Sequence, residues 1–115
     1  MTGITVIEGV TNPEIASNTR YEYCTFDGLD IGLDENTVYE GVVFENCDFL
    51  GCDFRAVMWY KCEWRFCYAC GIGMYSNIFA LCDIDMQVFQ STVKRCIAFG
   101  SYLFFNEYKE EINYI

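Results

Sequence analysis

A period of five residues runs through most of this chain. From Val42 the sequence divides into thirteen pentads, and eleven of them carry a large apolar side chain at the third position. A helix cannot use this spacing, because each step of five residues moves about 140° around the helix and spreads the apolar side chains over every face. In a strand, the first and third residues of a pentad point the same way. Two inward residues followed by a corner predict a four-sided coil of about 20 residues, the unit of a solenoid.

Side chains twenty residues apart should then stack on successive coils. The expected inward columns are Phe44, Trp64, Ile84 and Phe104; Phe49, Ala69 and Phe89; Tyr39, Trp59, Phe79 and Phe99; and Phe54, Met74 and Lys94. Lys94 departs from the apolar pattern. Either the division into pentads changes near this residue, or Lys94 lies at a corner where its long side chain reaches solvent.

Individual pentads carry a family resemblance. The segments CDFLG (47–51) and CDFRA (52–56) resemble the motif Ala-(Asp/Asn)-Leu-X-X of the pentapeptide-repeat family, with Cys in place of Ala and Phe in place of Leu. CEWRF and CDIDM match less closely. The resemblance covers residues 42 to 106 and implies an all-β fold, a right-handed quadrilateral β-helix of about four coils.

The chain is short enough for one domain. We expect an N-terminal cap over 1–20, the solenoid over 21–105 with a loop near 32–37 that resets its register, and a C-terminal helix over 106–115 that caps the last coil or pairs two copies. No apolar run approaches the length of a membrane span, and no signal peptide is visible. We therefore expect a cytoplasmic protein.

Eight cysteines would ordinarily indicate a disulfide framework, but six of them occupy first positions of pentads, where a thiol replaces alanine as a small apolar group. Cys70 and Cys96 fall outside these positions and should be more exposed. The absence of histidine removes Ser-His-Asp and Cys-His catalysis. We predict no catalytic residues, no metal and no cofactor, and thus a protein that is not an enzyme.

The net charge of −10 is unevenly placed, since residues 1–53 hold eleven acidic side chains and only one basic one, Arg20. This excess argues against direct contact with nucleic acid or an anionic membrane. It indicates either a solvated surface that serves solubility only or a surface that binds a basic protein partner. The candidate residues are a ladder of Glu45, Glu63, Asp83 and Asp85, together with Asp34, Glu35, Glu40, Asp48 and Asp53.

A second candidate surface is apolar. The solenoid frame turns outward Met58, Tyr60, Ile78, Ala80, Leu81 and Ala98. Two hypotheses follow. In the first, the protein is an acidic DNA mimic that inhibits a nucleic-acid-binding protein of the gyrase, restriction or CRISPR effector type. The resemblance to gyrase-binding family members implies this role. Such a protein would come from a phage, a mobile element or a host. In the second, it is a structural adaptor that binds through the apolar patch. A homodimer would form through the C-terminal end or the apolar side.

Overall fold

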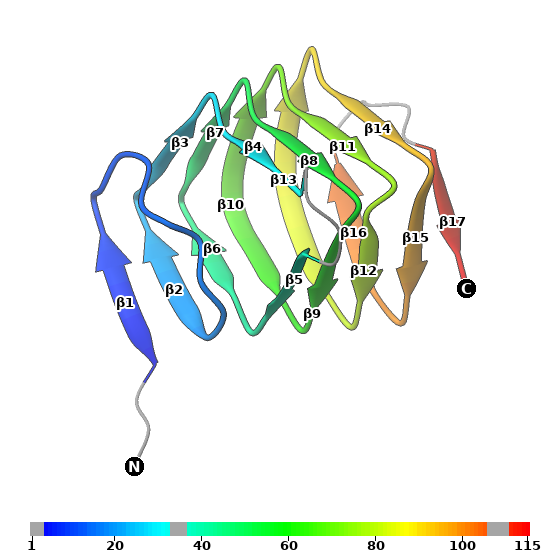
Figure 1. Ribbon diagram of the computed structural model, residues 1–115, viewed down its shortest axis with the longest axis horizontal. Coiled ribbons are helices and arrows are strands. Elements are labelled where there is room, and N and C mark those ends of the chain that lie inside the picture. Colours follow the sequence, from blue (N-terminus) through cyan, green and yellow to red (C-terminus); the bar gives the residue numbers. More distant parts are fainter. Residues whose placement is uncertain (1–3, 33–36, 106–110) are drawn as a thin grey trace.

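The computed structural model describes residues 4–32, 37–105 and 111–115, and these residues form strands and turns without a helix. The strands wind into a solenoid of about four coils with four sides (Figure 1).

On the first side lie β1 (Thr5–Glu8), β2 (Thr19–Glu22), β6 (Val43–Glu45), the first halves of β10 (Glu63–Cys70) and β13 (Asp83–Phe89), and β16 (Tyr102–Phe105). On the second side lie β3 (Thr25–Asp27), β7 (Asp48–Leu50) and the second halves of β10 and β13. On the third side lie β4 (Asp30–Ile31), β8 (Asp53–Arg55), β11 (Gly73–Tyr75) and β14 (Thr92–Lys94). On the fourth side lie β5 (Thr37–Glu40), β9 (Val57–Tyr60), β12 (Ile78–Ala80), β15 (Cys96–Phe99) and β17 (Ile112–Tyr114).

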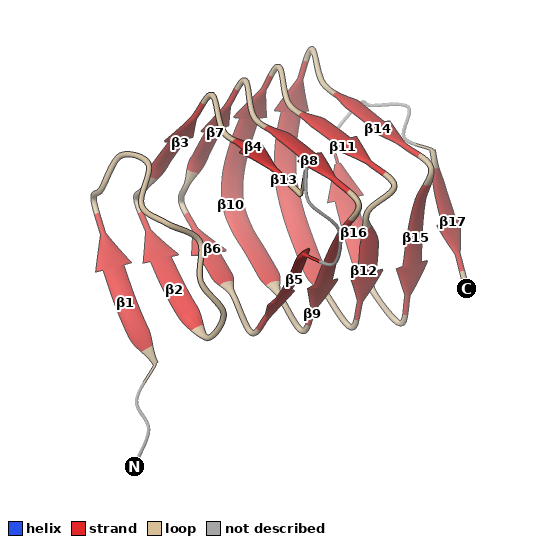
Figure 2. Cartoon of the chain, viewed as in Figure 1, coloured by secondary structure: helices blue, strands red, loops and turns tan. Residues whose placement is uncertain are grey.

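Neighbouring coils pair in parallel on every side (Figure 2). The first two sides form one sheet, because β10 and β13 continue around the corner between them, whereas the third and fourth sides are separate sheets. The molecule measures 38 × 27 × 27 Å, with the coils stacked along its long axis. The predicted four-sided, all-β solenoid is confirmed.

The corners fall at every fifth residue. From 41 to 81 each corner residue has a positive φ, and these residues are Gly41, Asn46, Gly51, Ala56, Lys61, Phe66, Gly71, Ser76 and Leu81. A side chain in this region costs about 1–2 kcal/mol at the non-glycine positions. Hydrogen bonds to the next coil offset the strain; for example, the Ala56 amide donates to the Tyr75 carbonyl and the Lys61 amide to the Ala80 carbonyl, both at 2.9 Å.

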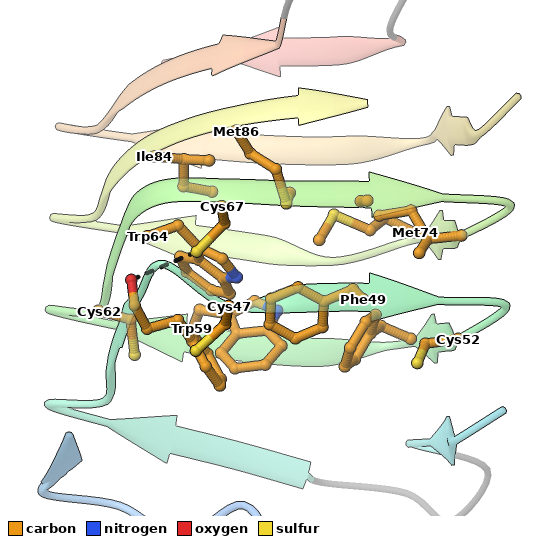
Figure 3. Close-up of a cluster of buried hydrophobic side chains, with 14 of the residues drawn as sticks. Cys47, Phe49, Cys52, Trp59, Cys62, Trp64, Cys67, Met74, Ile84 and Met86 are labelled. Atoms are coloured by element: carbon orange, nitrogen blue, oxygen red, sulfur yellow. Dashed lines mark hydrogen bonds between the residues drawn. The ribbon is translucent and has the colours of Figure 1, made fainter. Parts of the chain in front are cut away.

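Aromatic rings fill the interior of the first three coils. Phe44 contacts the rings of Tyr21, Phe49 and Trp64, with centroid distances between 5.1 and 5.4 Å. Trp59 and Trp64 meet edge to face at 4.7 Å, as Figure 3 shows. Stacked and edge-to-face pairs of this kind add to the gain from burying the rings.

One polar side chain lies among these rings. The Asn77 amide oxygen accepts a hydrogen bond from the Trp59 indole nitrogen at 2.8 Å, and its nitrogen donates to the carbonyls of Phe54 at 2.8 Å and Tyr75 at 3.0 Å. Asn77 is fully buried, and these bonds satisfy groups that would otherwise be costly to bury.

The fourth coil is one residue shorter than the five-residue period predicts. Trp64 pairs with Ile84 as expected, but Cys67 pairs with Met86, because β10 contains an extra residue at the Phe66 corner that β13 lacks. The next positive-φ corner after Leu81 is therefore Gln90.

This shortening corrects the last member of all four predicted columns. The residues that turn inward are Leu103, Val88, Ala98 and Val93, in place of Phe104, Phe89, Phe99 and Lys94. Phe89, Phe99 and Phe104 are exposed, and Cys96, predicted to be more exposed, is buried. A coil with fewer residues has a smaller interior, which suits Val88, Ala98 and Leu103 better than the rings of Phe89, Phe99 and Phe104.

The predicted C-terminal helix over 106–115 is wrong for residues 111–115, while 106–110 lie outside the described residues. Ile112 to Tyr114 form β17, which pairs with β15. The open edge of β15 explains the difference: the Cys96 amide donates to the Glu111 carbonyl at 3.1 Å, and the Ile115 amide donates to the Ala98 carbonyl at 2.8 Å. At the other end, β1 adds a further rung beside β2. The predicted loop at 32–37 falls mostly on residues 33–36, which also lie outside the described part.

The shortened coil can be tested with two adjacent residues. We expect Val88→Ser to lower the free energy of unfolding by about 2 kcal/mol, because it places a hydroxyl in the core and removes apolar contacts. Phe89→Ser, one residue on, should cost less than about 1 kcal/mol, because that ring is exposed and loses mainly its 5.2 Å contact with Tyr68. Urea unfolding of both variants measures the difference. A larger loss for Phe89→Ser would mean that the uninterrupted period is correct.

Candidate functional site

The predicted acidic ladder divides into two columns of the first side. Glu63 lies between Val43 and Asp83 in one column. In the other, Glu45 lies between Glu22 and Arg65, and Asp85 pairs with Phe104. The four carboxylates share one side, as expected, but do not form one continuous row.

Two arginines neutralise part of this side. Arg20 forms ion pairs with Glu22 at 3.2 Å and with Glu45, and Arg65 pairs with Glu63 at 2.7 Å. Within the described residues, Asp83 and Asp85 form no ion pair. The ladder is therefore less negative than the sequence alone indicates.

The remaining predicted carboxylates lie on other sides. Asp48 is on the second side between Thr25 and Tyr68, Asp53 is on the third side beside Asp30, and Glu40 is on the fourth side beside Tyr60. Asp34 and Glu35 lie outside the described residues.

Taken together, the acids of the N-terminal half encircle the first rungs. Besides the predicted residues, the carboxylates of this region are Glu8, Glu14, Glu22, Asp27 and Asp30, and Arg20 is the one base. The number of acidic residues in 1–53 indicates this arrangement, whereas a ladder of positions twenty residues apart contains only some of them. We call the acidic side chains of residues 4–32 and 37–53 the acidic girdle.

The apolar patch lies on the fourth side and is larger than predicted. Met58 and Ile78 occupy one column, which Val38 and Ile97 extend in register at either end. Val38 is 53% exposed. Tyr60 continues into a second column with Ala80 and Phe99, and Leu81 projects from the adjacent corner. Ala80 and Ala98 are corrections, because both are buried. The shortened coil turns Ala98 inward and its neighbours outward.

Exposed rings gather beside the acidic ladder. Phe66, at 71% exposure, lines a hollow of about 380 Å³ with Tyr102 and Phe104, and Asp83 and Asp85 lie in the same hollow. The sequence frame had assigned Phe104 to the interior. The one-residue shift places it outside.

Seven of the eight cysteines are buried, and all are free thiols. The pairs Cys47–Cys67 and Cys62–Cys82 stack on neighbouring coils, where the hydrogen bond with the facing thiol, and then burial, raise the pKa of Cys67 and Cys82. The thiols donate to carbonyls of the previous coil; Cys82 Sγ, for example, lies 3.2 Å from the Trp59 oxygen. In the part of the chain that the structure describes, no three Cys, Asp or Glu side chains are grouped closely enough to hold a metal ion.

A parallel, four-sided solenoid on a five-residue period is the architecture of the pentapeptide-repeat proteins, and this chain has it. No family model matches the sequence, and no curated protein matches it. Among solved structures the chain is similar to QnrB1, a plasmid-mediated fluoroquinolone resistance protein, at 9% identity over 90% of each chain with a TM-score of 0.25. At this level the similarity says nothing about what the chain binds. The described part of the chain contains no helix that could span a membrane.

Buried thiols predict a loss of stability at high pH. Desolvation raises the pKa of Cys24, Cys52 and Cys96 in the folded state. Because the folded state favours the protonated thiol, this contribution is complete below the unfolded pKa of about 8.5 and is lost as the pH rises above it. The free energy of unfolding should fall by up to about 1.4 kcal/mol per pH unit for each thiol.

Urea unfolding between pH 7 and 10 measures this slope. A variant with Cys24, Cys52 and Cys96 all changed to Ala, the residue of the repeat motif, should show a shallower slope than the parent. Equal slopes would show that these thiols do not titrate differently on folding.

Proposed function

We propose that this protein is a protein-binding module whose acidic girdle imitates the charge of duplex DNA and occupies the basic cleft of a DNA-binding protein. The observation that carries the proposal is the net charge of −10 on residues 1–53, whose described part contains the rungs of β1, β2 and β6.

The charge density supports the comparison with DNA. Three rungs occupy about 14 Å along the axis, at about 4.8 Å per rung. Duplex DNA carries one charge per 1.7 Å, or about eight charges over the same distance. The N-terminal half of the solenoid therefore matches DNA in charge per length, whereas residues 54–105 carry a net charge of +2 and do not.

Like charges lie next to each other in this region at a cost in stability. Asp30 and Asp53 are paired on neighbouring rungs of the third side, and Glu22 and Glu45 on the first side. Only the second pair has an arginine between its members, Arg20. Directly opposed like charges destabilise a sheet, and a binding role gives a reason to keep them.

The partner that fits is a DNA-processing protein with a basic cleft, such as gyrase, a restriction enzyme or a CRISPR effector. Carboxylates held on rigid rungs present charge without the ordering cost of a flexible acidic tail. Electrostatic attraction between the acidic girdle and a basic cleft speeds their association and weakens with added salt. On this proposal the protein inhibits by occupying the site and performs no reaction.

The test uses one enzyme of each type, with inhibition of its DNA reaction and binding measured at 50 and 300 mM salt. We expect inhibition of at least one, relieved at high salt and by excess duplex DNA. The variant Asp27→Asn/Asp30→Asn/Asp48→Asn should weaken binding at least tenfold. The matched variant Asp83→Asn/Asp85→Asn/Glu111→Gln removes the same charge from the later coils and should weaken it less than threefold. Equal losses, or no binding to any of the three enzymes, would contradict the proposal.

The apolar fourth side supports a second candidate function, an adaptor that binds protein or pairs two copies. The in-register column of Val38, Met58, Ile78 and Ile97 favours it. Four rungs of four-residue strands cover only about 250 Å². A standard interface needs about 800 Å² per partner, so this side would form the centre of a larger contact.

Sedimentation separates these two candidates. If the fourth side pairs two copies, the protein should dimerise at about 100 μM, and Ile78→Glu should return it to a monomer. Tyr102→Glu, on the first side, is the control and should leave the dimer intact. A monomeric parent protein would exclude pairing, and unchanged DNA-enzyme inhibition by Ile78→Glu would favour the acidic girdle.

A further inference from the structure

Basic side chains gather at one corner of this acidic molecule. A hollow of about 410 Å³ opens where the third side turns toward the fourth, and it is lined by Arg55, Ala56, Tyr75, Ser76, Lys94 and Arg95. Three of the seven basic residues of the chain thus line one hollow. The other hollow with an arginine and rings, around Phe66, also contains two aspartates.

Register and corner geometry together create this hollow. Arg55, Tyr75 and Lys94 are paired in one outward column of the third side. Ala56, Ser76 and Arg95 follow them at the corners, with φ values of 53°, 56° and 55°. The small side chains of Ala56 and Ser76 leave the corner open beside the column, and Arg95 lies at its far end.

The shortened fourth coil is what assembles the three cations. An uninterrupted period would turn Lys94 into the core, but the shift pairs Lys94 with Tyr75 and makes Arg95 the corner residue. Val93 takes the inward position and is buried. One missing residue therefore moves Lys94 from the interior into the outward column and Arg95 from that column to the corner beside it.

The positive charge of the hollow is only weakly offset. The Arg55 guanidinium lies over the Tyr75 ring, 4.8 Å from its centroid, and its ion pair with Asp53 is long, at 3.8 Å. Among the described residues, Lys94 and Arg95 form no ion pair. Glu111 lies on the opposite flank of Arg95, in a neighbouring hollow.

We propose that this basic hollow is a binding site for a phosphorylated small molecule, with linked phosphates as its preferred group. An arginine guanidinium binds two phosphate oxygens at once, and stacking on Tyr75 holds this one in place. Arg55 and Lys94 lie two rungs apart, about 10 Å. That separation suits two joined phosphates better than one. Because the protein as a whole repels anions, binding here requires a local site and does not follow from net charge.

Inorganic diphosphate is the probe, titrated into the full chain in 20 mM salt and followed by calorimetry and amide NMR shifts. We expect saturable binding, with the largest shifts at the amides of residues 55, 56, 75, 76, 94 and 95, and at least fivefold weaker binding of AMP, which offers a single phosphate. Arg55→Gln and Lys94→Gln/Arg95→Gln should each weaken diphosphate binding at least tenfold.

The chain provides a matched control in Arg65. Its side chain is 51% exposed, as is that of Arg55, and each pairs with the carboxylate two residues before it. Arg65→Gln should leave diphosphate binding within twofold of the parent. Far-UV circular dichroism checks that all variants are folded. Absence of saturable binding, shifts elsewhere on the surface, or equal weakening by Arg65→Gln would overturn the proposal.

Discussion

Stacking between coils is the constraint on which the rest of this structure depends. One coil is a single layer of side chains and cannot bury its own interior, so each inward side chain must pack against the inward side chain of the next coil. Tyr21, Phe44 and Trp64 form such a column on the first side. The parallel hydrogen bonds hold the spacing constant. Stability is therefore spread along the axis, and the surface side chains are carried on a rigid, repeated backbone.

The interior and the surface are coupled through the length of each coil. Where the coil loses one residue, the side chains that fill the interior are Val88, Val93, Ala98 and Leu103. The side chains that an uninterrupted period would turn inward, Phe89, Lys94, Phe99 and Phe104, lie outside. The exposed Phe99, the outward Lys94 and the corner Arg95 all follow from this single change. Two of the surfaces described above thus owe part of their composition to a packing requirement in the core.

Charge is polarised along the same axis. The first rungs carry the acidic girdle, the later coils carry a small positive excess, and the basic hollow lies in that later part. The two surfaces meet on β8, where Asp53 of the girdle forms its long ion pair with Arg55 of the hollow, and the other residues of the hollow lie on later coils. The apolar fourth side extends along the axis from β5 to β17 and gives the molecule a third kind of surface.

Sequence by itself determined the architecture, because a period of five with inward first and third positions leaves few alternatives to a four-sided coil. It also placed Phe44, Trp59 and Trp64 in the core and Met58 and Ile78 on the surface. Lys94 is the sign in the sequence that the frame changes after Ile84, but only the tertiary structure decided that frame. The other inward positions are apolar in either frame, and the omitted residue is located only by pairing with β10. The same holds for Ile112, which extends β15 as a strand, since the unpaired edge of the preceding coil is not visible in the local sequence.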